Sequence, residues 1–97
     1  MIVTLHPGAD EEVIAAAKYY GEHANRKVAE DFLAEFDRAV EILREFPRLG
    51  TPWRGAMRRF PLRRFPFTLV YYEPPAGLRI IAVAHQSRKP GYWRGRA

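Results

Sequence analysis

Residues 63–85 read RRFPFTLVYYEPPAGLRIIAVAH, and this stretch decides the fold. In its first part every second residue is large and apolar, which is typical of a strand with one buried face. One face is predicted to carry Phe65, Phe67, Leu69 and Tyr71, and the other Arg64, Thr68, Val70 and Tyr72. Residues 73–77, EPPAG, predict a hairpin loop. Residues 78–85 are apolar on both faces in their middle, which favours a central strand that helices cover on one side.

The segments before this hairpin predict a third strand and two helices. Residues 51–62, TPWRGAMRRFPL, form a link with Pro and Gly that leads into a basic strand near residues 57–62. Before it, apolar residues recur at helical spacing behind Asn25, a favoured N-cap, and Pro47 and Gly50 close this helix. The apolar positions of this helix are Ala29, Phe32, Leu33, Phe36, Ala39, Val40 and Leu43.

An earlier and less apolar helix is predicted to run to about Gly21. Its stripe comprises Ala9, Val13, Ala16, Ala17 and Tyr20. Asp10, Glu11 and Glu12 place negative charge in its first turn, where it complements the helix macrodipole. Residues 1–6 read as a short strand that Pro7 ends.

The predicted order is therefore strand, helix, helix and three strands. We expect an α+β fold of the β-α-α-β-β-β type, with a helical hairpin packed on one face of a mainly antiparallel sheet. Residues 1–97 are expected to form a single domain, since a chain this short supports one core.

The amino-acid composition argues against a metal site, a secretory signal and a membrane span. The chain has no cysteine, and His6, His23 and His85 are too scattered for metal-ligand spacing, so we expect no metal and no cofactor. The start lacks the basic and apolar regions of a signal peptide, and no run of eighteen apolar residues occurs. We expect a cytoplasmic protein with no membrane partner.

The net charge of +5 conceals two halves of opposite sign. Residues 1–50 hold six basic and ten acidic side chains, a net charge of −4, whereas residues 51–97 hold ten basic side chains and only Glu73, a net charge of +9. Such a basic half attracts phosphate backbones or acidic protein segments.

Several motifs in this order resemble the RelE/ParE toxins of type II toxin-antitoxin systems. They are the Tyr19-Tyr20 pair, a second helix that carries Phe32 and Phe36 and ends at FPRLG, then RRFPLRRFPFTLVYYE, RIIAVAH and RKPGYW. The resemblance covers almost the whole chain. It implies a toxin that a cognate acidic antitoxin neutralises, with operator DNA contacted only through the antitoxin. It also implies that the antitoxin docks on the helical hairpin and the sheet edge, for which the candidate residues are Tyr20, Phe32, Phe36, Phe65 and Phe67.

Within this family, ParE-like members inhibit DNA gyrase, and RelE-like members cut messenger RNA in the ribosome. Cleavage of RNA requires a base, an acid and cations that hold the phosphate, for which His85, Tyr92 and Arg64 are the candidates. The resemblance implies that the nuclease branch also uses either a carboxylate in the link after the second helix or a cluster of lysines. Here the link LGTPWRGAM contains no acid, and Lys89 is the only lysine after residue 50, so the gyrase-inhibiting branch is favoured. The alternative role of His85 is a hydrogen bond that fixes the C-terminal segment.

The arginines of residues 58–64 are the first choice for a target-binding surface. Alternation predicts Arg58 and Arg64 on one side of the strand and Arg59 and Arg63 on the other, with the guanidinium-rich side facing away from the helices. A purely solubilising role is the alternative, and Tyr92 and Trp93 are also expected to pack back onto the sheet. The predicted target-binding residues are Arg58, Arg59, Arg63, Arg64, Arg79, Arg88, Lys89, Tyr92, Trp93 and Arg94.

The favoured hypothesis is a ParE-like toxin that binds gyrase and is not itself an enzyme. The alternative is a ribosome-dependent mRNA endoribonuclease, and a third possibility is a basic adaptor without toxicity.

Overall fold

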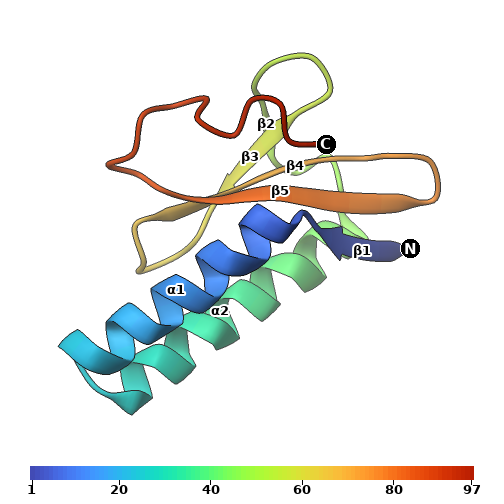
Figure 1. The fold of residues 1–97 in the computed structure, drawn as a ribbon. Coiled ribbons are helices and arrows are strands. Elements are labelled where there is room, and N and C mark those ends of the chain that lie inside the picture. The colour runs from blue at the N-terminus through green and yellow to red at the C-terminus, as the bar shows by residue number, and fades with distance from the viewer.

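The computed structural model describes all 97 residues and confirms the predicted α+β fold. A hairpin of two helices lies on one face of a five-stranded sheet, and the C-terminal segment runs over the other face (Figure 1). The elements are β1 (Ile2–Leu5), α1 (Pro7–His23), α2 (Arg26–Glu45), β2 (Thr51–Pro52), β3 (Arg58–Pro61), β4 (Phe67–Tyr72) and β5 (Gly77–His85). No helix is both long and apolar enough to cross a membrane.

The sheet has the strand order β1-β5-β4-β3-β2. The strands from β2 to β5 pair antiparallel with their neighbours, as the predicted meander requires, but β1 pairs parallel with β5 and makes the sheet mixed. The parallel pairing follows from the order of the elements, because the chain reverses four times between β1 and β5: once through the helical hairpin, which leaves β2 opposite to β1, and three times in the meander from β2 to β5. The two-residue strand β2 was not predicted.

Local signals set the ends of the helices. The Asn25 side chain accepts a hydrogen bond from the Val28 amide at 3.0 Å and caps α2, as predicted. Pro7 begins α1, where the Nδ1 atom of His6 accepts a hydrogen bond from the Gly8 amide at 2.9 Å. The helix α1 continues to His23, two residues beyond the predicted end at Gly21.

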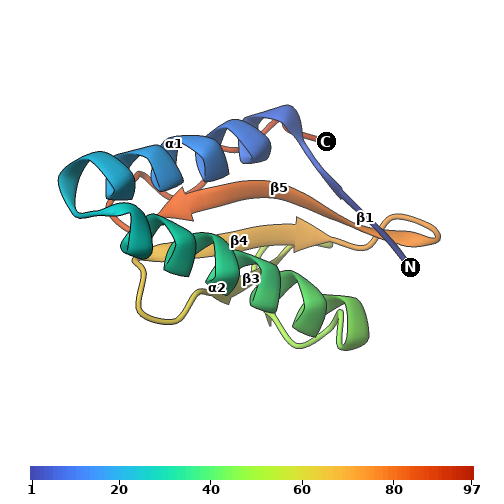
Figure 2. The same cartoon turned by 90° about the horizontal axis from the view of Figure 1, so that it is seen from below.

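Two apolar layers enclose the sheet. On the helix side, α1 and α2 cover β4 and β5 (Figure 2), and Phe32 and Leu43 of α2 are fully buried together with Leu69 and Tyr71 of β4. On the opposite face, hereafter the far face, the C-terminal residue Trp93 is buried over a second cluster that consists of Val70, Ile81, Ala82 and Ala84. The predicted packing of Trp93 onto the sheet is confirmed.

The Tyr71 hydroxyl ties β4 to the segment that follows α2. It donates a hydrogen bond to the Pro47 carbonyl at 2.7 Å and accepts one from the Gly50 amide at 2.9 Å. Burial raises the pKa of Tyr71, so the hydroxyl keeps its proton for the bond to Pro47. A Cβ atom at Gly50 would lie 2.5 Å from this hydroxyl oxygen, which explains why a glycine occupies the position.

We predict that Tyr71→Phe lowers the free energy of unfolding by about 2 kcal/mol, because it leaves the half-buried Pro47 carbonyl and the buried Gly50 amide without this partner. Urea denaturation followed by circular dichroism measures the change. The matched control is Tyr72→Phe at the next residue, which is only half-buried. Equal stability of the Tyr71→Phe variant and the natural protein would contradict the assigned role of this hydroxyl.

Candidate functional site

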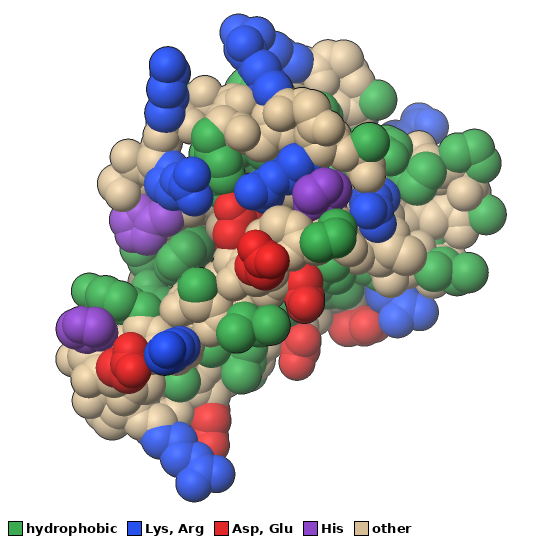
Figure 3. All heavy atoms as spheres, viewed as in Figure 1, with side chains coloured by type: hydrophobic (Ala, Val, Ile, Leu, Met, Phe, Trp, Pro, Cys, Tyr) green, Lys and Arg blue, Asp and Glu red, His purple; other side chains and the backbone are tan.

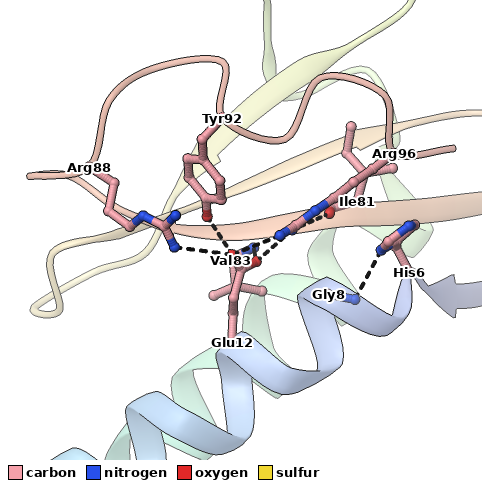
Figure 4. Close-up of polar contacts among 8 residues, drawn as sticks. All are labelled: His6, Gly8, Glu12, Ile81, Val83, Arg88, Tyr92 and Arg96. Atoms are coloured by element: carbon pink, nitrogen blue, oxygen red, sulfur yellow. Dashed lines mark hydrogen bonds and ion pairs between the residues drawn. The ribbon is translucent and has the colours of Figure 1, made fainter.

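The Glu12 carboxylate joins α1, β5 and the C-terminal segment (Figure 4). Its Oε1 atom accepts hydrogen bonds from the Val83 amide at 2.9 Å and from Arg96 at 3.0 Å. Its Oε2 atom accepts a hydrogen bond from the Tyr92 hydroxyl at 2.6 Å and lies 3.8 Å from Arg88. The sequence placed Glu12 only among the charges of the first helical turn, so its contacts with residues more than seventy positions away were missed.

These contacts replace a missing strand neighbour along half of β5. The register of β1 with β5 ends at the pair Leu5 and Ile80, so β5 continues beyond its neighbour. Past that point the Val83 amide donates to Glu12, and the Ile81 carbonyl accepts from Arg96 at 3.0 Å. Backbone groups on an open strand edge invite pairing with another chain, and these side chains cover part of that edge.

Tyr92 is held as a hydrogen-bond donor. Burial is the main cause that raises its pKa far above the ordinary tyrosine range, and the hydrogen bond to Glu12 adds to the shift. The guanidinium of Arg88 lies 3.7 Å above the centre of its ring. Because the hydroxyl keeps its proton and donates a hydrogen bond to Glu12, Tyr92 is unsuited to act as a general base.

The three nuclease candidates are held by different partners. The Nδ1 atom of His85 accepts a hydrogen bond from the Ser87 amide at 3.0 Å, which is the structural role predicted for it. Arg64 forms an ion pair with Asp31 of α2 at 2.8 Å. Tyr92 donates to Glu12, so each of the three side chains is already engaged by a partner of its own.

The arginines of residues 58–64 do not form one surface. Arg58 donates to the carbonyls of Arg48 and Gly50, and Arg64 pairs with α2, so the prediction that these two lie on one side is confirmed. The prediction that Arg63 accompanies Arg59 is wrong, because Arg63 lines a hollow beside α2 together with Arg64, and its backbone amide donates to Glu35 at 2.6 Å.

Side chains point alternately to the two faces of the sheet only as far as the end of β3. Arg64 has a φ angle of 70°, and the chain turns toward α2 after the end of β3 at Pro61. The prediction that Arg64 lies on the sheet face opposite to that of Phe65 is therefore also wrong. Among these four arginines only Arg59 lies on the far face. The predicted target-binding residue Arg79 instead holds the C-terminus and β1: its side chain donates hydrogen bonds to the Ala97 carbonyl at 2.9 Å and to the Thr4 hydroxyl at 3.1 Å.

The basic side chains nevertheless gather away from the helices. In Figure 3 most Lys and Arg side chains lie over the strands and the C-terminal segment, whereas Asp and Glu lie mainly over α1 and α2. Arg88, Lys89 and Arg94 of the C-terminal segment are exposed. Arg59 and Arg88 border one small hollow of about 160 Å³ on the far face.

An apolar groove of about 490 Å³ lies between α1 and the end of β5. Of the predicted antitoxin-binding residues, Tyr20 and Phe67 line this groove. The other three, Phe32, Phe36 and Phe65, are buried in the helix-side core and offer no surface to a partner. Apolar residues at this spacing are typical of a core, which is why the sequence could not separate burial in the core from contact with an antitoxin.

No group of three or more His, Cys, Asp or Glu side chains is arranged to hold a metal ion.

Comparison with known proteins finds a matching family model and similar solved structures. A family model described as "ParE toxin of type II toxin-antitoxin system, parDE" matches residues 3–90. Among solved structures, the chain is similar to one from the "Chromosomal ParDE TA system from P. aeruginosa", with a TM-score of 0.77 and 17% sequence identity. That alignment covers 88% of this chain and 95% of the other, and at this identity it shows a shared fold alone. No curated protein matches the sequence.

We predict that Glu12→Gln loosens the C-terminal segment, because the neutral amide loses the charge that holds Arg96 and Arg88. The free energy of unfolding is expected to fall by about 2 kcal/mol. Trypsin is expected to cleave after Arg88 and Arg94 at least several-fold faster. The neighbouring exposed residue provides the control, Glu11→Gln, which should match the natural protein. Unchanged cleavage rates in Glu12→Gln would show that other contacts hold the segment.

Proposed function

The chain belongs to the ParE toxin family of type II toxin-antitoxin systems, and from this premise we propose that it inhibits DNA gyrase and is neutralised by an acidic antitoxin. The observation that carries the choice of target is that His85, Arg64 and Tyr92 are each already engaged by a different partner. A nuclease needs a base, an acid and cations around one phosphate. A protein-binding toxin needs only a complementary surface, and the exposed cations of the C-terminal segment provide one.

The apolar groove supports the proposed site for the antitoxin. Its lining combines Ala15, Tyr19 and Tyr20 of α1 with Phe67 and Val83 of the sheet. The lining also includes the part of β5 that extends beyond β1, where an extended segment can lie alongside the strand. Arg88 and His85 border the same groove, so an antitoxin segment that carries both apolar and acidic side chains fits it.

We predict that expression of the toxin without its antitoxin arrests growth, and that the purified toxin blocks supercoiling by gyrase at stoichiometric amounts. Primer extension on translated mRNA is expected to show no new 5' ends. The variant His85→Ala should still arrest growth, because in this proposal His85 borders the binding surface but performs no chemical step. New 5' ends that disappear in His85→Ala, together with normal supercoiling, would instead identify the endoribonuclease alternative.

We predict that Ala15→Arg weakens binding of the acidic antitoxin encoded beside the toxin gene by at least ten-fold, or about 1.4 kcal/mol. Ala15 is exposed and lines the groove, so a long side chain there obstructs a docked segment without disturbing the core. Isothermal titration calorimetry measures the dissociation constant. The control is Ala34→Arg on the exposed surface of α2, outside the groove. Equal weakening by both substitutions would place the antitoxin elsewhere.

A further inference from the structure

The small hollow on the far face, hereafter the far-face pocket, is lined by donors without an acid among them. Its polar lining includes Arg59, Thr68, Gln86 and Arg88, and Trp93 forms part of its wall. We propose that this pocket binds one side-chain carboxylate of the target protein. The inference rests on the proposed function, because it names the chemistry by which the toxin would recognise a protein target.

The charge of the pocket is available to a ligand. Arg59 is exposed and forms none of the ion pairs in the structure, and the Arg88 side chain remains 54% exposed although it contacts Glu12 at 3.8 Å and covers the Tyr92 ring. The apolar side chains of Val70 and Ala84 also line the pocket. Beside such apolar surface an arginine attracts a carboxylate more strongly than in open water, and its planar guanidinium can hold both oxygens.

The indole of Trp93 supplies an independent observation. Its Nε1 atom is the one buried side-chain nitrogen or oxygen in the structure that has no hydrogen-bond partner, and the residue is only 4% exposed. An indole N–H can donate but cannot accept. A buried donor without an acceptor is destabilising, and because Trp93 forms part of the pocket wall, its indole N–H reports a charge that enters the pocket.

Size and stacking favour a carboxylate over a nucleotide. The pocket volume of about 160 Å³ is well below the roughly 300 Å³ at which small-molecule sites begin. Recognition of single-stranded RNA uses free aromatic faces on which bases stack. Here Arg88 covers the Tyr92 ring at 3.7 Å, and Trp93 is buried with its ring centre 5.2 Å from that of Trp53. These aromatic residues are therefore already occupied.

The test is a titration of the ¹⁵N-labelled full chain followed by its two tryptophan indole signals, which Trp53→Phe assigns. The probe is a ten-residue peptide rich in Glu and Asp, and its matched control replaces these residues with Gln and Asn. We expect the acidic peptide to move the Trp93 indole proton downfield and saturably. We expect Arg59→Gln to weaken binding at least ten-fold, and Arg54→Gln, an exposed arginine that does not line the pocket, to weaken it less than two-fold.

Three outcomes would overturn the inference. An unmoved Trp93 signal would show that the pocket takes no carboxylate. Equal weakening by Arg59→Gln and Arg54→Gln would show general charge attraction. Saturable shifts with inorganic phosphate and an RNA decamer, but not with the acidic peptide, would assign the pocket to nucleic acid. The titration needs no gyrase, so a silent pocket in a toxin that still blocks supercoiling overturns this inference alone.

Discussion

The structure depends on covering both faces of β5. Five consecutive residues of this strand, from Ile80 to Ala84, are buried, and a strand of this kind needs apolar partners on each side. The two helices supply one side, and Trp93 supplies the other from the C-terminal segment. A chain of 97 residues buries a smaller fraction of its surface on folding than a larger domain does, so the core needs the contribution of the C-terminal segment. The same segment also carries exposed cations.

The Glu12 carboxylate determines where the C-terminal segment lies relative to the sheet edge. It contacts Tyr92, Arg88 and Arg96 from one side and the Val83 amide from the other. Arg88 and His85 border both the apolar groove and the far-face pocket. A segment docked in the groove would therefore touch two residues that also border the pocket, and this provides a physical route by which an antitoxin could interfere with target binding.

The sequence predicted the elements of the fold far better than the site. The alternation that placed Leu69 and Tyr71 on the core face was correct, because the register shift between β4 and β5 skips Ile81 of β5 and leaves the alternation of β4 intact. The same rule failed for Arg63 and Arg64, where the chain leaves the sheet and turns toward Asp31 and Glu35. Helical periodicity also identified Phe32 and Phe36, but it could not show whether a core or a partner buries them.

Sequence alone determined the two helices, the N-cap at Asn25, the hairpin of β4 and β5 and the opposite charge of the two halves, because each depends on residues that are near one another in the chain. Tertiary structure alone decided the parallel pairing of β1 with β5, the contacts of Glu12 and the separation of the arginines. These features join residues up to 84 positions apart, and such pairs depend on the packing of the whole chain rather than on local conformational preference.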